Sequence, residues 1–461
     1  MIIPKKVAQK SRNFHWHPHL SNEVYSFLIF SEHINSFFPA ILAKTRQFVT
    51  KIYRSFDKIG HKPSVKGKAT MMRRSALRRS KRLTEKDVLV ATLLKENPEA
   101  SIRRLSSLSR FSKDAIFRST RKMSMVMDMK RRALINYPII GLKPAFVFAT
   151  SKIEKADVAF ESLRMPYLNH IFTLMGGETF AFLAFYSLPN PAVLKPILGS
   201  YRSWRWHVKQ YVMECSSIGS DISFQYYSVK AGEWNVTWPL WGLFLKEILL
   251  RKGFAEVQKL TQHNYRYPDK QLKIDPLQLE ILKELRQDSQ MDASGLVEKH
   301  RTSYAAIRKK QQILRDQGAY WLHLSIDPIK SKLFDRIVLI VDMKEEDLLD
   351  SVQIALQALP YSITYRVTGD LSGIIAILSL PSPGVSRIFH ILSEHLWEMV
   401  DNYWIFPVIR HLEVRDPFPV KLFNAEKQEW LFPPKIENRK YVSYEEQVKE
   451  FGLSELADGD F

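Results

Sequence analysis

Two short segments of the chain carry basic and polar side chains at a spacing that suits contact with nucleic acid. Each begins at a serine that is a good helix N-cap, and the free N–H groups of a helix start can hold a phosphate. When the apolar residues of a helix point inward, the others share its outer face, and such a helix fits the major groove. The residues predicted to contact DNA are Ser112, Lys113, Phe117, Arg118, Arg121 and Lys122, and then Ser303, Tyr304, Arg308, Lys309, Lys310 and Gln312. The alternative interpretation is that both are ordinary solvated helix faces.

Positive charge is concentrated around these segments. The chain has a formal net charge of +20, which favours a polyanionic partner. Residues 73–132 contain eighteen lysines and arginines against six acidic residues, and residues 273–316 contain nine against seven. Residues 73–82 form a basic arm that could add phosphate contacts, or could only keep the chain soluble. The local excess predicts double-stranded DNA as the partner.

A second candidate site lies at two turns, each made of a glycine followed by an acidic residue. The pairs are Gly177-Glu178 and Gly369-Asp370, and glycine permits the backbone conformation of a tight turn. Exposed N–H groups beside a carboxylate could hold a small effector such as an amino acid. The alternative is a plain hairpin turn between two strands.

The sequence lacks the common motifs of enzymes. There is no GxSxG, P-loop, HExxH or Rossmann glycine motif, and the single cysteine, Cys215, excludes a cysteine-rich metal cluster. The histidines lack the spacing of a metal site. Those interpreted as surface or core residues are His300, His323, His390, His395 and His411. We therefore predict no catalytic residue, no metal and no cofactor, and a protein that is not an enzyme.

An internal repeat indicates which elements position these residues. Residues 176–191 (GGETFAFLAFYSLPNP) and 368–383 (TGDLSGIIAILSLPSP) match at six of sixteen positions, including a glycine and both prolines. A shift of 191 residues aligns Ser112 with Ser303 and Ile116 with Ile307, within forty positions that need no gap. The chain is therefore predicted to contain one module twice.

Each module begins with three helices and continues as a mixed helix and strand unit. Thr84 with Asp87 resembles a capping box, and the apolar spacing after it predicts a helix-turn-helix. The later pattern reads strand, helix, strand, strand, helix, strand, which is the ferredoxin-like order. The predicted fold class is α+β, with two winged or helix-turn-helix three-helix units, each followed by a ferredoxin-like βαββαβ domain, in tandem duplication.

Shifts in composition set the predicted domain boundaries. Residues 1–82 are an N-terminal extension and basic linker, and Met71 or Met72 could be the true start of translation. The boundaries that follow are 83–135 and 273–324 for the helix-turn-helix domains, 136–232 and 325–420 for the ferredoxin-like domains, 233–272 for a connecting helix and linker, and 421–461 for a C-terminal tail. No apolar stretch reaches the length of a membrane helix and no signal peptide is evident, which predicts a cytoplasmic protein without a membrane partner.

The pattern of the second module carries a family resemblance. Its residues are Ile274, Asp275, Ile281, Leu282, Leu285, Leu296, Ser303, Ile307, Leu314 and Gly318, followed by Thr368, Gly369 and Asp370. On these residues the chain resembles the Lrp/AsnC (feast/famine) family of transcription regulators. The first module departs from the pattern, because Met127 takes the position of Gly318 and Gly-Gly-Glu replaces Thr-Gly-Asp.

The resemblance implies a mode of assembly and two alternative functions. It implies ferredoxin-like (RAM-type) domains that pair through their sheets, here as an intramolecular pseudo-dimer that could form further homo-oligomers, with effectors near the Gly-Asp turns. The main prediction is a sequence-specific DNA-binding transcription regulator of Lrp/AsnC type, which reads an asymmetric site and responds to a small effector. Siroheme decarboxylases are also similar in architecture, although their arginine-rich stretch before Trp-Pro-Tyr is here Arg164-Met-Pro-Tyr. A siroheme decarboxylase-like tetrapyrrole enzyme with fused duplicate modules is therefore the alternative.

Overall fold

The computed structural model describes residues 82–432, apart from 153–159, 161–162, 177–178, 201–207, 251–261, 266–271, 288–293, 344, 397–399 and 415–416. Several predictions made from the sequence lie outside the described residues. They concern residues 1–81, the Gly177-Glu178 turn, the first helix of the first ferredoxin-like domain, most of the linker before the second module, and the tail after residue 432.

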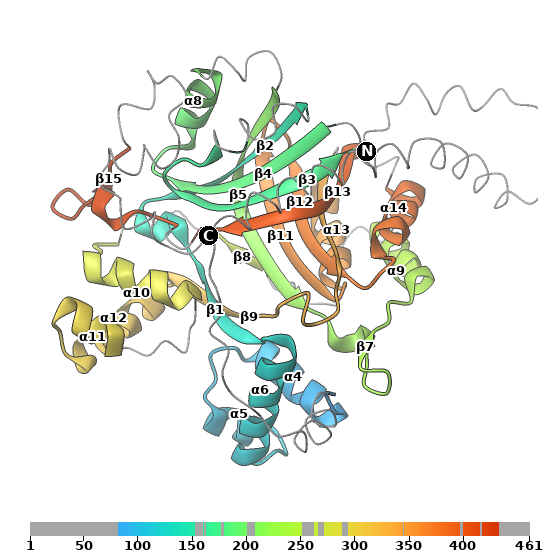
Figure 1. The fold of residues 1–461 in the computed structure, drawn as a ribbon, viewed down its shortest axis with the longest axis horizontal. Coiled ribbons are helices and arrows are strands. Elements are labelled where there is room, and N and C mark those ends of the chain that lie inside the picture. The colour runs from blue at the N-terminus through green and yellow to red at the C-terminus, as the bar shows by residue number, and fades with distance from the viewer. Residues whose placement is uncertain are drawn as a thin grey trace, which may run out of the picture. The chain divides into compact units, whose positions relative to one another are not determined.

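Three helices form the first unit, drawn in blue and teal in Figure 1: α4 (Glu85–Glu96), α5 (Ile102–Leu108) and α6 (Lys113–Met127). The predicted capping box is confirmed, because the Asp87 carboxylate accepts from Thr84 N at 2.8 Å and Thr84 Oγ1 accepts from Asp87 N at 3.3 Å. Ser112 caps α6 by accepting from Ala115 N at 3.3 Å. The helices enclose a small core in which Ile116 is fully buried.

The second unit repeats this arrangement with α10 (Pro276–Gln287), α11 (Ser294–His300) and α12 (Tyr304–Asp316), drawn in yellow in Figure 1. Ser303 caps α12 by accepting from Ala306 N at 3.1 Å. Leu282, Leu285 and Leu314 are buried between the helices. Each unit continues into one strand, and the two strands, β1 (Lys130–Ile135) and β9 (Tyr320–Ser325), pair antiparallel as a ribbon that joins the modules.

Each ribbon strand leads into a four-stranded ferredoxin-like sheet. The first sheet has the order β3-β4-β2-β5 and the second β11-β12-β10-β13, so both repeat the same topology. The strands of the first are β2 (Lys143–Lys152), β3 (Leu168–Gly176), β4 (Thr179–Leu188) and β5 (Val208–Ile222). Those of the second are β10 (Asp335–Met343), β11 (Tyr361–Gly369), β12 (Gly373–Leu380) and β13 (Val400–Glu413). The predicted α+β fold class with a tandem duplication is confirmed.

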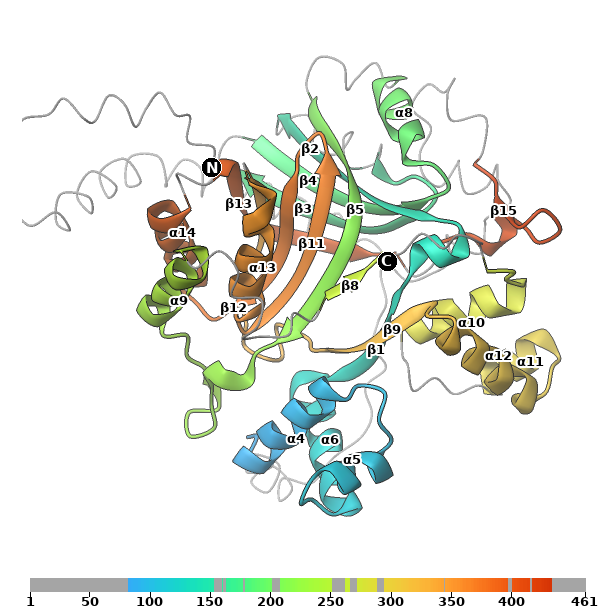
Figure 2. The same ribbon diagram turned by 180° about the vertical axis from the view of Figure 1, so that it is seen from behind.

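Helices cover the outer face of the second sheet, as Figure 2 shows. The helices are α9 (Trp238–Leu250), α13 (Leu349–Gln357) and α14 (Gly384–His395), and α8 (Leu194–Ser200) belongs to the first sheet. Trp241 and Leu245 of α9 pack with Leu339 and Ala376 of the sheet in one apolar cluster. The helix between the modules is thus recruited by the second of them.

The two sheets join at both edges and form a closed barrel. β13 pairs with β3, and β11 pairs with β5, so that all strands of the large sheet except β8 (Gln262–Asn264) form a ring. Aromatic side chains fill the interior of the barrel, where their contacts join strands that are not neighbours in the sheet. Phe146 of β2 lies 4.8 Å from Tyr365 of β11, and Phe148 lies 5.5 Å from Phe406 of β13, measured between ring centroids.

A short hairpin ends each module and packs on the other one. The hairpins consist of β6 (Tyr227–Ser228) with β7 (Glu233–Trp234), and of β14 (Phe423–Asn424) with β15 (Glu429–Trp430). Trp234 Nε1 donates to Ser331 O at 2.9 Å, and Trp430 Nε1 donates to Ile140 O at 2.6 Å. These reciprocal contacts bind the modules together in addition to the strand pairs.

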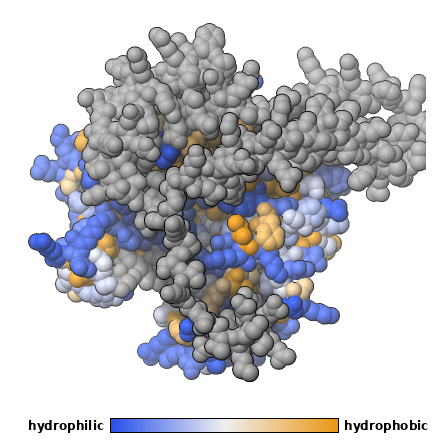
Figure 3. All heavy atoms as spheres, viewed as in Figure 1, coloured by the Kyte–Doolittle hydropathy of each residue, from blue (hydrophilic) through white to orange (hydrophobic). Residues whose placement is uncertain are grey.

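The remaining elements are short, and the surface is mixed. The 3-10 turns lie at Tyr137–Ile140, Pro191–Val193, Phe224–Tyr226, Glu346–Leu348 and Val420–Leu422. The face drawn in Figure 3 mixes hydrophilic and hydrophobic residues. Within the described residues, no helix combines the length and the apolar character that crossing a bilayer requires.

Candidate active site

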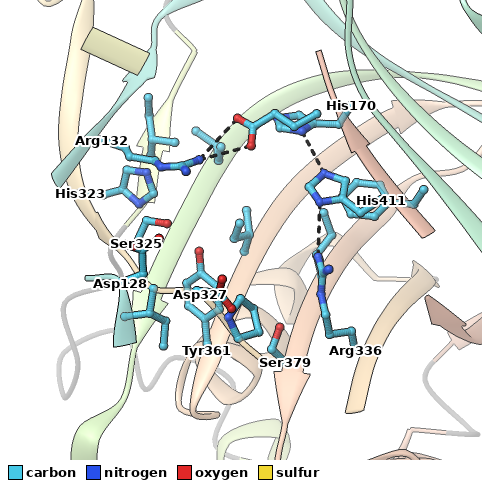
Figure 4. Close-up of a pocket in the computed structure, with 18 of the residues that line it drawn as sticks. Asp128, Arg132, His170, His323, Ser325, Asp327, Arg336, Tyr361, Ser379 and His411 are labelled. Atoms are coloured by element: carbon cyan, nitrogen blue, oxygen red, sulfur yellow. Dashed lines mark hydrogen bonds and ion pairs between the residues drawn. The ribbon is translucent and has the colours of Figure 1, made fainter. Parts of the chain in front are cut away.

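A cavity of about 320 Å³ lies between the ribbon and the interior of the barrel (Figure 4). It takes residues from both modules, since β1 and β3 of the first face β9 to β13 of the second. Its polar and charged lining residues are Asp128, Arg132, His170, Arg286, His323, Ser325, Asp327, Arg336, Tyr361, Ser379, His411 and Glu413. Its apolar floor includes Phe172, Ile218, Ile363, Tyr365 and Ile377.

Three arginines from three different elements approach this cavity. Arg132 comes from β1, Arg286 from α10 and Arg336 from β10. The Nε atoms of Arg132 and Arg336 are buried and have no hydrogen-bond partner within the described part of the chain. Because a guanidinium can only donate, such atoms are suited to an incoming acceptor such as a carboxylate.

Glu413 supplies a carboxylate among these arginines. Its Oε2 lies 3.3 Å from Arg132 Nη1, and its Oε1 lies 3.6 Å from Arg286 Nη2. Burial alone would raise the pKa of Glu413, but His170 and the two guanidiniums outweigh that effect and lower the pKa to about 2. Glu413 is therefore ionised at neutral pH. Asp327 is a second carboxylate of the lining and acts electrostatically on Arg336, whereas Asp128 pairs with Lys130 and Lys330. Glu413 and Asp327 together do not balance three guanidiniums.

Two histidines contact each other at one side of the cavity, as Figure 4 shows. His170 Nδ1 lies 3.1 Å from His411 Nε2, and the His411 ring stacks on Phe172 with centroids 4.3 Å apart. Burial, reinforced by the nearby guanidiniums, lowers the pKa of His411 to about 4 and that of His170 well below its ordinary value. Both rings are therefore neutral at neutral pH.

The histidine pair lies between two guanidiniums, which creates a mismatch of donors. Arg286 Nη2 lies 3.0 Å from His170 Nε2, and Arg336 Nη2 lies 3.4 Å from His411 Nδ1. If both outer ring nitrogens accept from arginine, both inner nitrogens carry hydrogen and face each other as two donors. A chain of two neutral imidazoles therefore leaves one of its three contacts unsatisfied. The longest contact, between Arg336 and His411, is the weakest of them.

A row of polar side chains continues from Arg336 across the barrel wall. Arg336 is paired in register with Ser379, and Ser379 with Tyr361, on the neighbouring strands β10, β12 and β11. Burial raises the pKa of Tyr361, so its hydroxyl stays protonated and can donate. On the opposite wall His323 Nδ1 lies 3.1 Å from Ser220 Oγ, and burial lowers the pKa of His323 to about 3.

The repeat places different residues at equivalent positions of the two barrel junctions. His411 is paired with Phe172 where β13 meets β3, and Ile218 is paired with Tyr365 where β5 meets β11. With β4 and β12 aligned by their offset of 192 residues, the strand pairings place Ile363 at the position of His170 and Ile218 at that of His411. Within the described residues, the histidine pair is therefore present at one junction and replaced at the other.

The residues predicted to contact DNA do not take part in this cavity. Lys113, Phe117, Arg118 and Arg121 lie exposed on α6, but Lys122 is bound at 2.8 Å to Asp87 inside the first unit.

In the second unit, Tyr304, Lys309 and Gln312 are exposed on α12. Arg308 donates to the Tyr304 hydroxyl, Lys310 is ion-paired with Asp275, and Gln312 donates to Asp316 at 2.6 Å. Ser112 and Ser303 act as caps. Several of the predicted contacts are thus committed within their own unit.

The described Gly-acid turn is a junction between modules. The Asp370 carboxylate accepts from Lys195 Nζ at 2.6 Å and from Val212 N at 2.8 Å, both in the first module. Gly369 has a φ of +124°, and a Cβ there would lie 2.9 Å from Val212 O. These contacts account for the glycine and the acid without an effector. Gly177 and Glu178 lie outside the described residues.

Sequence reasoning missed the residues of the cavity because they lie far apart along the chain. Arg132, His170, Arg286, Arg336 and His411 meet only when both edges of the two sheets have joined. His411 was interpreted as a scattered histidine because no metal-ligand spacing surrounds it, and within the described residues no metal-binding cluster is found. One local signal was present: His411 and Glu413 alternate on one strand and so share one of its faces.

Comparisons with known proteins find similar solved structures but no related sequence. No family model and no curated protein sequence matches the chain. One similar solved structure is the siroheme decarboxylase NirDL, with a TM-score of 0.39 and 11% identity over 75% of this chain and 96% of that one. A second is NirDL in complex with an iron-uroporphyrin III analogue, with a TM-score of 0.38 and 9% identity over 71% and 92% of the two chains. At these scores the likeness concerns the fold alone.

The prediction of a DNA-binding transcription regulator that is not an enzyme is wrong. The similar solved structures are siroheme decarboxylases, which is the class of enzyme given as the alternative prediction. The barrel cavity gathers buried charged and titratable side chains, whereas the exposed side chains predicted to contact DNA lie outside it. The physical reason for the error is that a helix-turn-helix is a packing motif, and its outer charges alone do not establish a nucleic-acid partner.

Proposed function

We propose that the chain is an enzyme that binds a carboxylate-bearing tetrapyrrole at the barrel cavity and removes a carboxyl group, in the manner of a siroheme decarboxylase. The observation that carries this proposal is the presence, in one cavity, of partnerless Nε donors on Arg132 and Arg336 together with a neutral histidine pair that contacts Arg336. The structure of NirDL in complex with an iron-uroporphyrin III analogue suggests the substrate class.

The arginines would hold the substrate by its carboxylates. Three guanidiniums against the carboxylates of Glu413 and Asp327 leave the cavity with an excess of positive charge, which favours an acidic ligand. A volume of about 320 Å³ is at the small end of ligand sites, so the cavity suits one acid-bearing edge of a macrocycle. Ile329, which lines the cavity and is 65% exposed, offers an apolar rim for the rest of the ring.

The histidine pair would supply the proton that decarboxylation consumes. The carbon–carbon bond to the carboxylate breaks, carbon dioxide leaves, and the electron pair that remains on carbon takes up one proton. In the free protein burial holds the pKa of His411 near 4, so the ring is neutral. A substrate carboxylate beside Arg336 and His411 favours the charged imidazolium, so that substrate and proton enter together. His411 then donates as the general acid, and His170 stands behind it at 3.1 Å.

The two modules would work as an intramolecular pseudo-dimer with one equipped junction. Fusion allows equivalent positions to diverge, and Ile218 and Ile363 stand where the other junction has His411 and His170. We therefore propose one reaction site for each chain.

The test is an anaerobic incubation of the full chain with siroheme, followed by mass spectrometry of the extracted tetrapyrrole. We expect products that lack one or more carbon dioxide equivalents. Lys95→Met is the matched control, because Lys95 occupies the position of Arg286 in the first unit, where its partner is Asp221 at 2.7 Å, and should retain activity. No product from a folded protein that binds siroheme would refute the proposal, as would full activity in His411→Phe.

A further inference from the structure

A helix of the second three-helix unit reaches into the proposed reaction site. Arg286, in the last turn of α10, is 7% exposed and lines the cavity. Its Nη1 donates to Val414 O at 2.9 Å, and its Nη2 lies 3.0 Å from His170 Nε2. The side chain is thus held at the end of β13 while it contacts the imidazole.

These contacts determine which nitrogen of His170 carries hydrogen. A guanidinium has donors only, so His170 Nε2 must offer its lone pair to Arg286. In the neutral ring the hydrogen is then on Nδ1, which donates to His411 Nε2 at 3.1 Å. His411 in turn carries its hydrogen on Nδ1, on the side of Arg336. Both Arg336 and His411 therefore present N–H groups to the same place, where a carboxylate oxygen can accept from both.

We propose that Arg286 is a positioning residue that fixes the direction of the His170–His411 pair, so that its proton-bearing end faces the substrate. The inference rests on the proposed function of the same cavity, and it makes the second three-helix unit a part of the catalytic apparatus.

Without Arg286 the opposite direction becomes the favoured one. With hydrogen on Nε2 of both rings, His411 Nε2 donates to His170 Nδ1, and His411 Nδ1 accepts from Arg336. Both contacts that remain after the loss of Arg286 are then satisfied. Arg336 would then donate to His411 and not to a ligand. This single reversal of the hydrogen-bond direction would weaken both His411 as the general acid and Arg336 as the binding site for the substrate carboxylate.

The first three-helix unit serves as an internal comparison. Lys95 is equivalent to Arg286 by the offset of 191 residues, and it forms an ion pair with Asp221. The position equivalent to His170 is Ile363, and no imidazole stands there. At this position the first unit is therefore held by an ion pair, whereas the second contacts the site.

Other charged and titratable groups surround the His170–His411 pair, and they act on its pKa values together with Arg286. His170 is faced by Arg286 from α10, by His411 and Glu413 from β13 and by Arg132 from β1, and His411 is faced by Arg336 from β10. Arg286 is one of the positive groups that lower the pKa of His170, so its removal should raise that pKa.

The experiment reads tautomers directly by NMR of the full chain with ¹⁵N-labelled histidine near neutral pH. We expect His170 to have hydrogen on Nδ1 in the unmodified protein and in Arg286→Lys, which keeps a cationic donor. In Arg286→Met we expect hydrogen on Nε2 or a protonated ring, while Lys95→Met leaves His170 unchanged. An Arg286→Met protein that folds, as judged by its thermal unfolding, and keeps hydrogen on Nδ1 alone would overturn the inference.

Activity provides a second readout that separates the two proposals. With siroheme as substrate, Arg286→Met should lower kcat roughly tenfold, less than the ~100-fold or more that a whole acid–base group contributes, and Arg286→Lys should restore most of it. A tautomer change without any turnover in the unmodified protein would keep the positioning role and reject the decarboxylase. Turnover that is equal in all three proteins would reject the positioning role and keep the decarboxylase.

Discussion

Replacement of Glu413 by glutamine tests the electrostatics of the cavity in depth. The pKa of Glu413 falls from 4.5 to about 2 in the folded protein, and one pKa unit corresponds to about 1.4 kcal/mol. The largest contribution that ionised Glu413 can make to the free energy of unfolding is therefore about 3 kcal/mol. The side chain of Glu413 is 37% exposed, and screening by solvent reduces its expected contribution to about 1–2 kcal/mol. Glu413→Gln should therefore lower the free energy of unfolding by about that amount at neutral pH.

The sign of the pH dependence follows from the lowered pKa. The stabilising contribution is present above the ordinary pKa of 4.5 and is lost as the pH falls toward 2, because the folded state then has to take up the proton. Urea unfolding should show a difference in the free energy of unfolding between the two proteins that is constant above pH 5 and shrinks at lower pH. In an Arg132→Met background the difference should also be smaller, since one guanidinium is missing. A difference that is independent of both pH and Arg132 would refute the reasoning.

Three further predictions concern the site and the barrel. Arg336→Met should weaken the binding of a carboxylate ligand roughly 10- to 100-fold in calorimetry, as expected for a lost charge-assisted hydrogen bond, whereas exposed Arg118→Met should not change it. His411→Phe should lower decarboxylation of siroheme ~100-fold or more but weaken siroheme binding much less, because Arg132 and Arg336 still hold the carboxylate, and an equal loss of both would contradict a role in proton transfer. Gly369→Ala should lower the free energy of unfolding by more than ~1 kcal/mol, because the residue has a φ of +124° and a Cβ there would lie 2.9 Å from a backbone oxygen. Gly295→Ala, where nothing lies within 4 Å of the new Cβ, is its control in the same denaturation assay.

The local parts of the fold can be predicted from the sequence. Thr84, Ser112 and Ser303 mark helix starts because an N-cap acts within three residues of the chain, and all three caps are present. The strand and helix order of each ferredoxin-like domain also follows from local periodicity, which is why both sheets have the expected topology.

The site could not be predicted in the same way because it depends on closure of the barrel. His170 and His411 lie on strands of different modules and meet where β13 pairs with β3. No sequence motif marks Arg286, and only the docking of α10 on the end of β13 gives it a partner at Val414. Paired polar residues such as His411 and Glu413 on one face of an apolar strand are the signal that could have prompted a search for partners in the other module.

A structure of the full chain in complex with siroheme, prepared anaerobically, tests the central claim most directly. We predict that a tetrapyrrole carboxylate accepts from Arg132 or Arg336 within the barrel cavity, close to His411 Nδ1. Siroheme bound elsewhere on the chain, with these arginines still free of any ligand, would contradict the account.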